Sequence, residues 1–180
     1  MQRRIYLLIL LCLCASVEVH ANFIEYSVAG KVYEGYYLKE HKKAPLVVII
    51  HDWDGLTDYE VKRAKMLSSA GYNVFAVDMF GKGVRPTKIE DKKNLTGALY
   101  KDRKKMRMLI KAGLMKANDK GLNTKNAAIM GYCFGGTCVL ESARAGDQLN
   151  AFVSFHGGLT IPKGQNYKNT KGRLLVFHGT

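Results

Sequence analysis

The sequence lacks the cysteine framework on which small disulfide-rich proteins depend. It has four cysteines in 180 residues, and Cys12 and Cys14 fall in the apolar stretch at the start. Of the remaining two, Cys133 is expected at the apex of a turn and Cys138 more than one helical turn later, so we expect no disulfide between them. The fold must then rest on an apolar core, and the length predicts one globular domain.

The chain also lacks an apolar run long enough for an ordinary membrane-spanning helix. Its longest run, Ile5 to Val17, is short, follows the basic pair Arg3-Arg4, and is followed by Val19-His20-Ala21. This pattern is typical of a signal peptide. We therefore expect residues 1–21 to be removed and residues 22–180 to be exported, to the periplasm or beyond, without a lipid or membrane anchor.

Acidic residues are few. There are 15 Asp and Glu against 28 Lys and Arg, which gives a net charge of +13. The lysines are scattered and alternate with acids along predicted helices, and no nucleic-acid-binding motif is present. We therefore expect no nucleic-acid partner and interpret the charge as solvated helix faces with some attraction for anionic partners. No internal repeat or low-complexity linker divides the chain.

The most informative stretch for chemistry is AAIMGYCFGG, residues 127–136. It predicts a short apolar strand, a Gly-x-Cys-x-Gly turn and a helix over 137–144, which is the pattern of a nucleophile elbow with cysteine at its apex. Gly131 and Gly135 fit because small residues are needed beside the apex. The helix N-terminus would favour the Cys133 thiolate and later an oxyanion. The alternative is a buried structural cysteine.

The remaining sequence alternates between predicted strands and helices. A hairpin is expected around Ala29-Gly30, and a capping box at Thr57-x-x-Glu60 begins a helix that ends at Gly71. Further strands are expected at 46–50, 73–77, 151–155 and 174–177, with one long helix over about 94–118. Buried strands that alternate with helices predict an α/β fold with a mostly parallel sheet.

A polar and aromatic cluster, HDWDG at residues 51–55, follows the strand at 46–50. Open α/β sheets bind their ligands at this carboxyl edge. We expect the backbone N–H groups of Phe134 and Trp53 to form an oxyanion hole, with Asp52 close to the sulfur of Cys133. An ordinary loop is the alternative interpretation of the cluster.

The sequence resembles the dienelactone hydrolase family. The resemblance covers roughly residues 24–180 and lies on VVIIHDWDGL, AGYNVFAVDMFG, GYCFGG and VSFHGGL, in this order. It implies an α/β-hydrolase fold, which in this chain would lack its last strand and helix. It also implies hydrolysis of a carboxylic ester or lactone through a thioester on Cys133, without a metal or cofactor.

The resemblance further assigns roles around the thiol. Asp52 stands where the family has a glutamate that holds the resting thiol. Lys82, with Arg85 close by, stands near the family's substrate-binding arginine, which implies a small ester or lactone substrate that can be anionic. The family's acid and histidine are expected beyond Thr180, so this chain alone would acylate slowly and deacylate more slowly.

The three histidines near predicted strand ends, His51, His156 and His178, are not the base in the family pattern. We expect structural or pocket-lining roles for them and keep a substitute base as the alternative. Two other functions remain open. One is a non-catalytic exported binding protein with this fold, and the other is a redox role in which Cys133 forms sulfenic acid.

Overall fold

A computed structural model describes residues 20–40 and 43–179. Except for His20 and Ala21, the predicted signal peptide lies outside these residues. The first described strand begins at His20.

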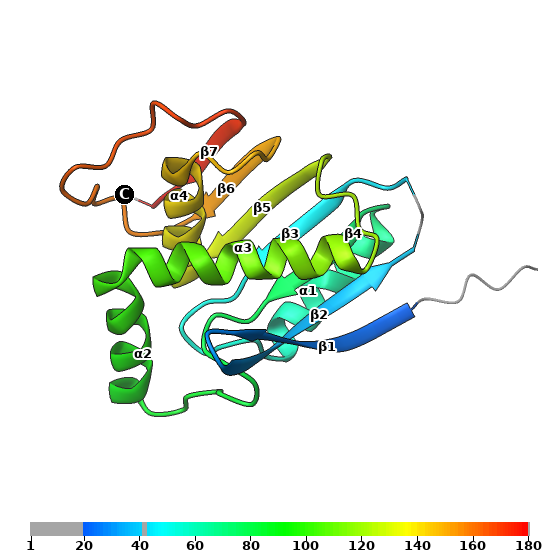
Figure 1. Ribbon diagram of the computed structural model, residues 1–180, viewed down its shortest axis with the longest axis horizontal. Helices are drawn as coiled ribbons and strands as arrows, with labels where there is room; N and C mark the ends of the chain where they lie inside the picture. The colour runs from blue at the N-terminus through cyan, green and yellow to red at the C-terminus, as the bar shows by residue number, and fades with distance from the viewer. Residues whose placement is uncertain (1–19, 41–42, 180) are drawn as a thin grey trace, which may run out of the picture.

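The described strands form one seven-stranded sheet in the order β1-β2-β4-β3-β5-β6-β7 (Figure 1). β1 and β2 are an antiparallel hairpin, β2 is antiparallel to β4, and the other neighbours are parallel. This confirms the edge hairpin and the mostly parallel sheet. The strands are β1 (His20–Val28), β2 (Lys31–Lys39), β3 (Leu46–Ile50), β4 (Asn73–Val77), β5 (Ala127–Tyr132), β6 (Ala151–Phe155) and β7 (Arg173–Phe177).

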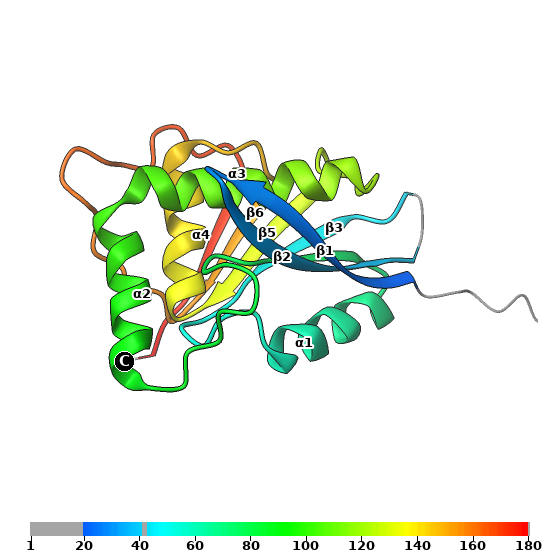
Figure 2. The same ribbon diagram turned by 60° about the horizontal axis from the view of Figure 1, so that its bottom comes forward.

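Helices cover both faces of the sheet. Figure 2 shows α1 on one face and α3 and α4 on the other. A separate apolar core lies between the sheet and the helices on each face. Ala64 of α1 belongs to one core, and Leu109 of α3 and Val139 of α4 belong to the other. The helices are α1 (Asp58–Ser69), α2 (Ile89–Lys101), α3 (Arg103–Asp119) and α4 (Phe134–Ala145).

The single long helix expected over 94–118 is wrong. Asp102 leaves the helical conformation at φ −111° and ψ 80°, ends α2, and accepts a hydrogen bond from the N–H of Lys105 at 2.9 Å. An aspartate in this position satisfies a free N–H of the new helix, which favours a new start over continuation. The apolar side chains expected on one face are nevertheless buried on both helices, as at Leu99 and Ile110.

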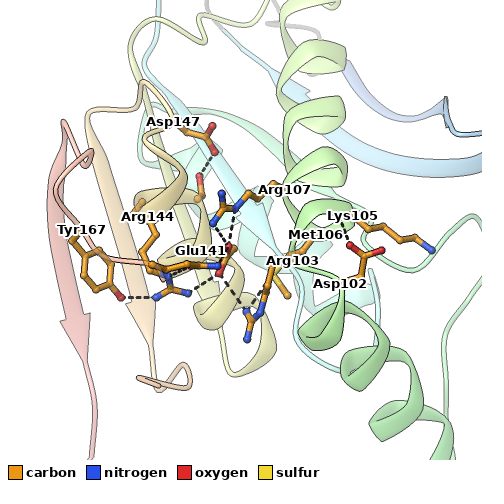
Figure 3. Close-up of polar contacts among 12 residues, drawn as sticks. Asp102, Arg103, Lys105, Met106, Arg107, Glu141, Arg144, Asp147 and Tyr167 are labelled. Carbon is orange, nitrogen blue, oxygen red and sulfur yellow. Dashed lines mark hydrogen bonds and ion pairs between the residues drawn. The ribbon is translucent and has the colours of Figure 1, made fainter. Parts of the chain in front are cut away.

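A buried ionic cluster joins α3 to α4 (Figure 3). The fully buried carboxylate of Glu141 pairs with Arg107 at 2.6 Å, with Arg144 at 2.9 Å and with Arg103 at 3.6 Å. Arg144 also donates to the hydroxyl of Tyr167 at 2.7 Å. The cluster thus ties the segment between β6 and β7 to the helix that follows Cys133.

Candidate active site

Cys133 occupies a strained turn between β5 and α4. Its φ is 51° and its ψ is −115°, a region that residues with side chains rarely adopt. Its N–H donates to the carbonyl of Phe155 at 3.0 Å, and its side chain is exposed. The predicted strand, turn and helix are therefore present, although α4 begins at Phe134, three residues earlier than expected.

The two predicted elbow glycines are required by close backbone approaches. A Cβ on Gly131 would lie 2.4 Å from the carbonyl carbon of Gly135. A Cβ on Gly135 would lie 2.3 Å from the carbonyl oxygen of Ile50 in β3. These distances are far inside ordinary contact, so only glycine lets α4 sit this close to the sheet.

The two described cysteines differ in environment. Both are free thiols, as expected. Cys138 is completely buried in α4, and burial raises its thiol pKa well above the usual range. Cys133 is exposed beside the N-terminus of α4, where the helix dipole favours negative charge.

The expected oxyanion donors lie at the ends of neighbouring strands. β3 and β5 are parallel with Ile50 opposite Gly131, so the loop that carries Trp53 and the turn that carries Phe134 leave the same edge of the sheet. Phe134 is the first residue of α4, where an N–H has no helical acceptor. Within the described residues neither N–H makes a hydrogen bond, so both are free to donate a hydrogen bond to an anion.

His51 is a structural residue. Its ring is completely buried; Nδ1 donates to the carbonyl of Asp52 at 2.6 Å, and Nε2 accepts from the N–H of Met79 at 2.9 Å. Burial lowers its pKa, against the opposing hydrogen bond to Asp52 and the charge of Asp78. Both ring nitrogens are therefore occupied in a neutral ring, which leaves none to act as the base.

Asp52 shapes the loop. Its Oδ1 accepts from the N–H of Asp54 at 2.8 Å, which is the geometry of a local turn. Its charge also contributes to the raised pKa of Glu60, after burial of that carboxyl. Among the described contacts, no hydrogen bond joins Asp52 to the sulfur of Cys133, so the expected hold on the thiol stays a prediction.

The two expected substrate-binding cations lie apart. Lys82 is exposed and pairs with Glu25 on β1. Arg85 is half-buried, and its side chain packs against Gly55 in the loop after β3. Arg85 is also among the charges that lower the pKa of His51, after burial. The structure therefore brings Arg85, but not Lys82, to the loop that carries Trp53.

The other histidines lie at the same sheet edge. His156 is exposed after β6, with φ 41°, and its N–H donates to the carbonyl of Phe177 at 2.7 Å. Its ring centroid lies 6.3 Å from that of Tyr132. His178 is exposed after β7. Their roles in the chemistry stay predictions.

Helix α2, which contacts the start of α4, was not expected near this site. The Tyr100 ring lies 5.7 Å from the Phe134 ring, so α2 packs against the start of α4. Burial raises the pKa of Tyr100, with smaller contributions from Cys138 and Cys133. The single helix expected over 94–118 includes the end of α2, so it did not predict that α2 turns away from α3 at Asp102. A signal was available in Asp102, a good helix-capping residue.

No cluster of three or more His, Cys, Asp or Glu side chains that could hold a metal ion occurs within residues 20–40 and 43–179. In the same ranges no helix has the length and apolarity needed to cross a membrane.

The sheet order and the cysteine elbow define an α/β hydrolase. Residues 34–180 match the family model described as the dienelactone hydrolase family. The chain therefore belongs to the dienelactone hydrolase family, as its motifs predicted. A search of curated proteins gives no match.

Solved structures agree with this assignment. The structure named m3DLH is 32% identical, with a TM-score of 0.82, and the match covers 89% of this chain and 69% of that one. The dienelactone hydrolase-like promiscuous phosphotriesterase P91, from metagenomic libraries, is 28% identical over the same shares, with a TM-score of 0.79. An acylaminoacyl peptidase from Pyrococcus horikoshii, 18% identical, shares the fold over 89% of this chain and 31% of its own, with a TM-score of 0.66.

Proposed function

We propose that this protein hydrolyses carboxylic esters or lactones with Cys133 as the nucleophile. The observation that carries the proposal is the exposed thiol on a strained turn. The N–H of Phe134 follows it directly, the N–H of Trp53 belongs to a loop at the same edge of the sheet, and neither is paired among the described residues. Strain of this kind is stored where a side chain must be presented to a ligand. A buried structural cysteine would need neither the exposure nor the free donors.

The reaction follows from these groups. The thiolate of Cys133 attacks the acyl carbon, an S–C bond forms, and the carbonyl electron pair moves to oxygen. The N–H groups of Phe134 and Trp53 stabilise that oxyanion. Its collapse breaks the C–O bond of the ester and leaves a thioester with release of the alcohol. Water then attacks the thioester, which frees the acid and restores the thiol.

Arg85 supports an anionic substrate. Of the two expected cations, Arg85 is the one that packs beside the Trp53 loop, whereas Lys82 is engaged by Glu25. A guanidinium can hold a carboxylate through two parallel hydrogen bonds. We therefore place Arg85 ahead of Lys82 as the residue that selects a negatively charged ester or lactone.

The test is direct detection of the acyl-enzyme. The protein, expressed to the natural end of its reading frame, is mixed with p-nitrophenyl acetate, and p-nitrophenolate release is followed with the intact mass. We expect one acetyl group on the peptide that contains Cys133 and none in Cys133→Ala. Acetylation of the wild type elsewhere, or equal turnover by Cys133→Ala, contradicts the proposal.

The export of the protein stays part of the proposal. It is supported by the basic, apolar and small-residue pattern of residues 1–21. Ester hydrolysis outside the cytoplasm is the function that we infer from the two together.

A further inference from the structure

Helix α2 stands apart from the helix layers on the two sheet faces, beside the edge at which the parallel strands end (Figure 1). Nothing in the expected chemistry gives this helix a role. Two of its side chains, Lys92 and Tyr100, reach the two segments that carry the oxyanion donors. These contacts lie near opposite ends of the helix.

The first contact is made by Lys92, whose side chain is only 16% exposed. Its ammonium forms an ion pair with Asp54 and lies 5.2 Å from the centre of the Trp53 ring. Asp54 Oδ1 is buried, although the Asp54 side chain as a whole is 40% exposed, and it accepts no hydrogen bond among the described residues; the Lys92 ammonium is the charge that it contacts. Lys92 therefore contacts the loop at two points, the Trp53 ring and the carboxylate of Asp54.

The second contact is made by Tyr100, which covers the start of α4. Its ring packs on Phe134, with the two ring centres 5.7 Å apart. Behind it, the Arg103 guanidinium lies 5.1 Å from the Tyr100 ring centre, and its Nε donates to the Tyr100 carbonyl at 3.0 Å. Arg103 is itself paired with the buried Glu141. Tyr100 is thus fixed from behind by the ionic cluster.

We infer that α2 is a brace that sets the spacing of the two oxyanion donors, with Lys92 and Tyr100 as its positioning residues. Lys92 acts through Trp53 and Tyr100 acts through Phe134. The inference rests on the proposed function, because it takes the N–H groups of these two residues as the donors.

The expected effect follows from the geometry that an oxyanion hole needs. Donors act at about 2.7–3.1 Å from the developing oxyanion, and loss of one donor lowers the rate about 100- to 1,000-fold. A displacement of about 1 Å can cost about 100-fold. Lys92→Met keeps the aliphatic stem but leaves Asp54 Oδ1 buried without a counter-charge, so the Trp53 loop should move. Lys92→Arg keeps the charge and the stacking on the ring.

The experiment compares two reactions of the same thiol. Acylation by p-nitrophenyl acetate passes through an oxyanion, whereas alkylation by iodoacetamide displaces iodide and forms none. Both rates are measured in single turnover at Cys133, on the protein expressed to the natural end of its reading frame. Lys93→Met is the matched control, because Lys93 is the exposed neighbour on α2 and has no ion pair in the described part of the chain.

For Lys92→Met we expect acylation to slow about 10- to 100-fold while alkylation stays within about twofold. Lys92→Arg should recover most of the loss, and Lys93→Met should match the wild type. Tyr100→Leu, which removes the ring that packs on Phe134, should lower acylation selectively. An unchanged acylation rate in Lys92→Met, or an equal loss of rate in acylation and alkylation, overturns the inference that α2 positions the donors. A wild type that alkylates but is never acylated at Cys133 instead refutes the proposed function, and the inference with it.

Discussion

Three helical glycines give a test of the fold, because the same change, Gly→Ala, should alter the free energy of unfolding differently at each of the three positions. Gly97 lies in α2, Gly113 in α3 and Gly135 in α4. In an exposed helix interior, Gly→Ala stabilises a protein by about 0.5–1 kcal/mol, because alanine loses less conformational freedom on folding. The atoms that the new Cβ contacts decide whether this stabilisation is observed.

The surroundings of each glycine set the magnitude. A Cβ on Gly97 meets no atom within 4 Å, so the full gain of about 0.5–1 kcal/mol is expected. On Gly113 it lies 2.6 Å from a methyl of Val77, a buried β-branched side chain, and we expect a net loss of about 1–2 kcal/mol. On Gly135 it lies 2.3 Å from the Ile50 carbonyl oxygen, which β3 cannot withdraw because it is paired on both sides. We expect a loss of about 3 kcal/mol or more there.

The assay is urea unfolding followed by circular dichroism, with the free energy of unfolding extrapolated to water. Iodoacetamide labelling of Cys133 under native conditions is measured in parallel, because only Gly135→Ala should also disturb the elbow. The expected order of stability is Gly97→Ala, wild type, Gly113→Ala, Gly135→Ala. If Gly135→Ala lies within about 1 kcal/mol of Gly97→Ala, α4 does not contact β3 as described and the elbow geometry is wrong.

Three further results are expected. Iodoacetamide at neutral pH should label Cys133 at least about tenfold faster than the buried Cys138, and equal labelling in a peptide map would refute the assigned environments. Burial opposes charge on Glu141, but hydrogen bonds from Arg144 and Arg107 outweigh it and lower its pKa. Its carboxylate therefore stabilises the fold fully above the unfolded-state pKa of about 4.3, and this contribution is lost as pH falls through the lower folded-state pKa. In urea unfolding at pH 7, the free energy of unfolding of Glu141→Gln should be about 3 kcal/mol lower than that of the wild type, and this difference should become smaller in acid. A difference that does not change with pH contradicts the ionic cluster. The N-terminus of protein from the native host should be Asn22 by mass spectrometry, whereas one that retains Met1 refutes export.

The strands could be predicted from the sequence because each is a short apolar run bounded by turn residues. β3 (Leu46–Ile50) and β4 (Asn73–Val77) have the predicted limits, and every residue in them is buried. The capping box at Thr57 and Glu60 is also confirmed, since both of its reciprocal hydrogen bonds are present. These features depend on neighbours a few residues away, which the sequence displays directly.

The side-chain partners could not be predicted, because they depend on long-range packing. Lys82 pairs with Glu25, 57 residues earlier in the chain, on a hairpin whose position beside β4 no local pattern specifies. His51 receives its hydrogen bond from Met79 at the end of a neighbouring strand. The break at Asp102 is a different kind of error, because the capping signal there is local and helix periodicity was given more weight.

Backbone strain in the described residues is concentrated at the candidate site. Three described residues other than glycine have positive φ, and two of them, Cys133 and His156, lie at this site; the third is Ala29. Ala29 is followed by Gly30, also at positive φ, in the two-residue turn of the hairpin, a turn type that itself requires this conformation.

The other two strained residues have no such local cause. They end the adjacent strands β5 and β6, and the N–H of Cys133 donates to the residue just before His156. A Cβ on Gly157 would lie 2.5 Å from the backbone of Gly136 in α4, so the turn after β6 presses against the helix that begins at the elbow. Each strained residue costs about 1–3 kcal/mol and persists only where surrounding structure fixes it. Because these two turns fix each other, contacts between the turn after β6 and α4 hold both residues in their strained conformations, as the proposed presentation of the Cys133 thiol requires.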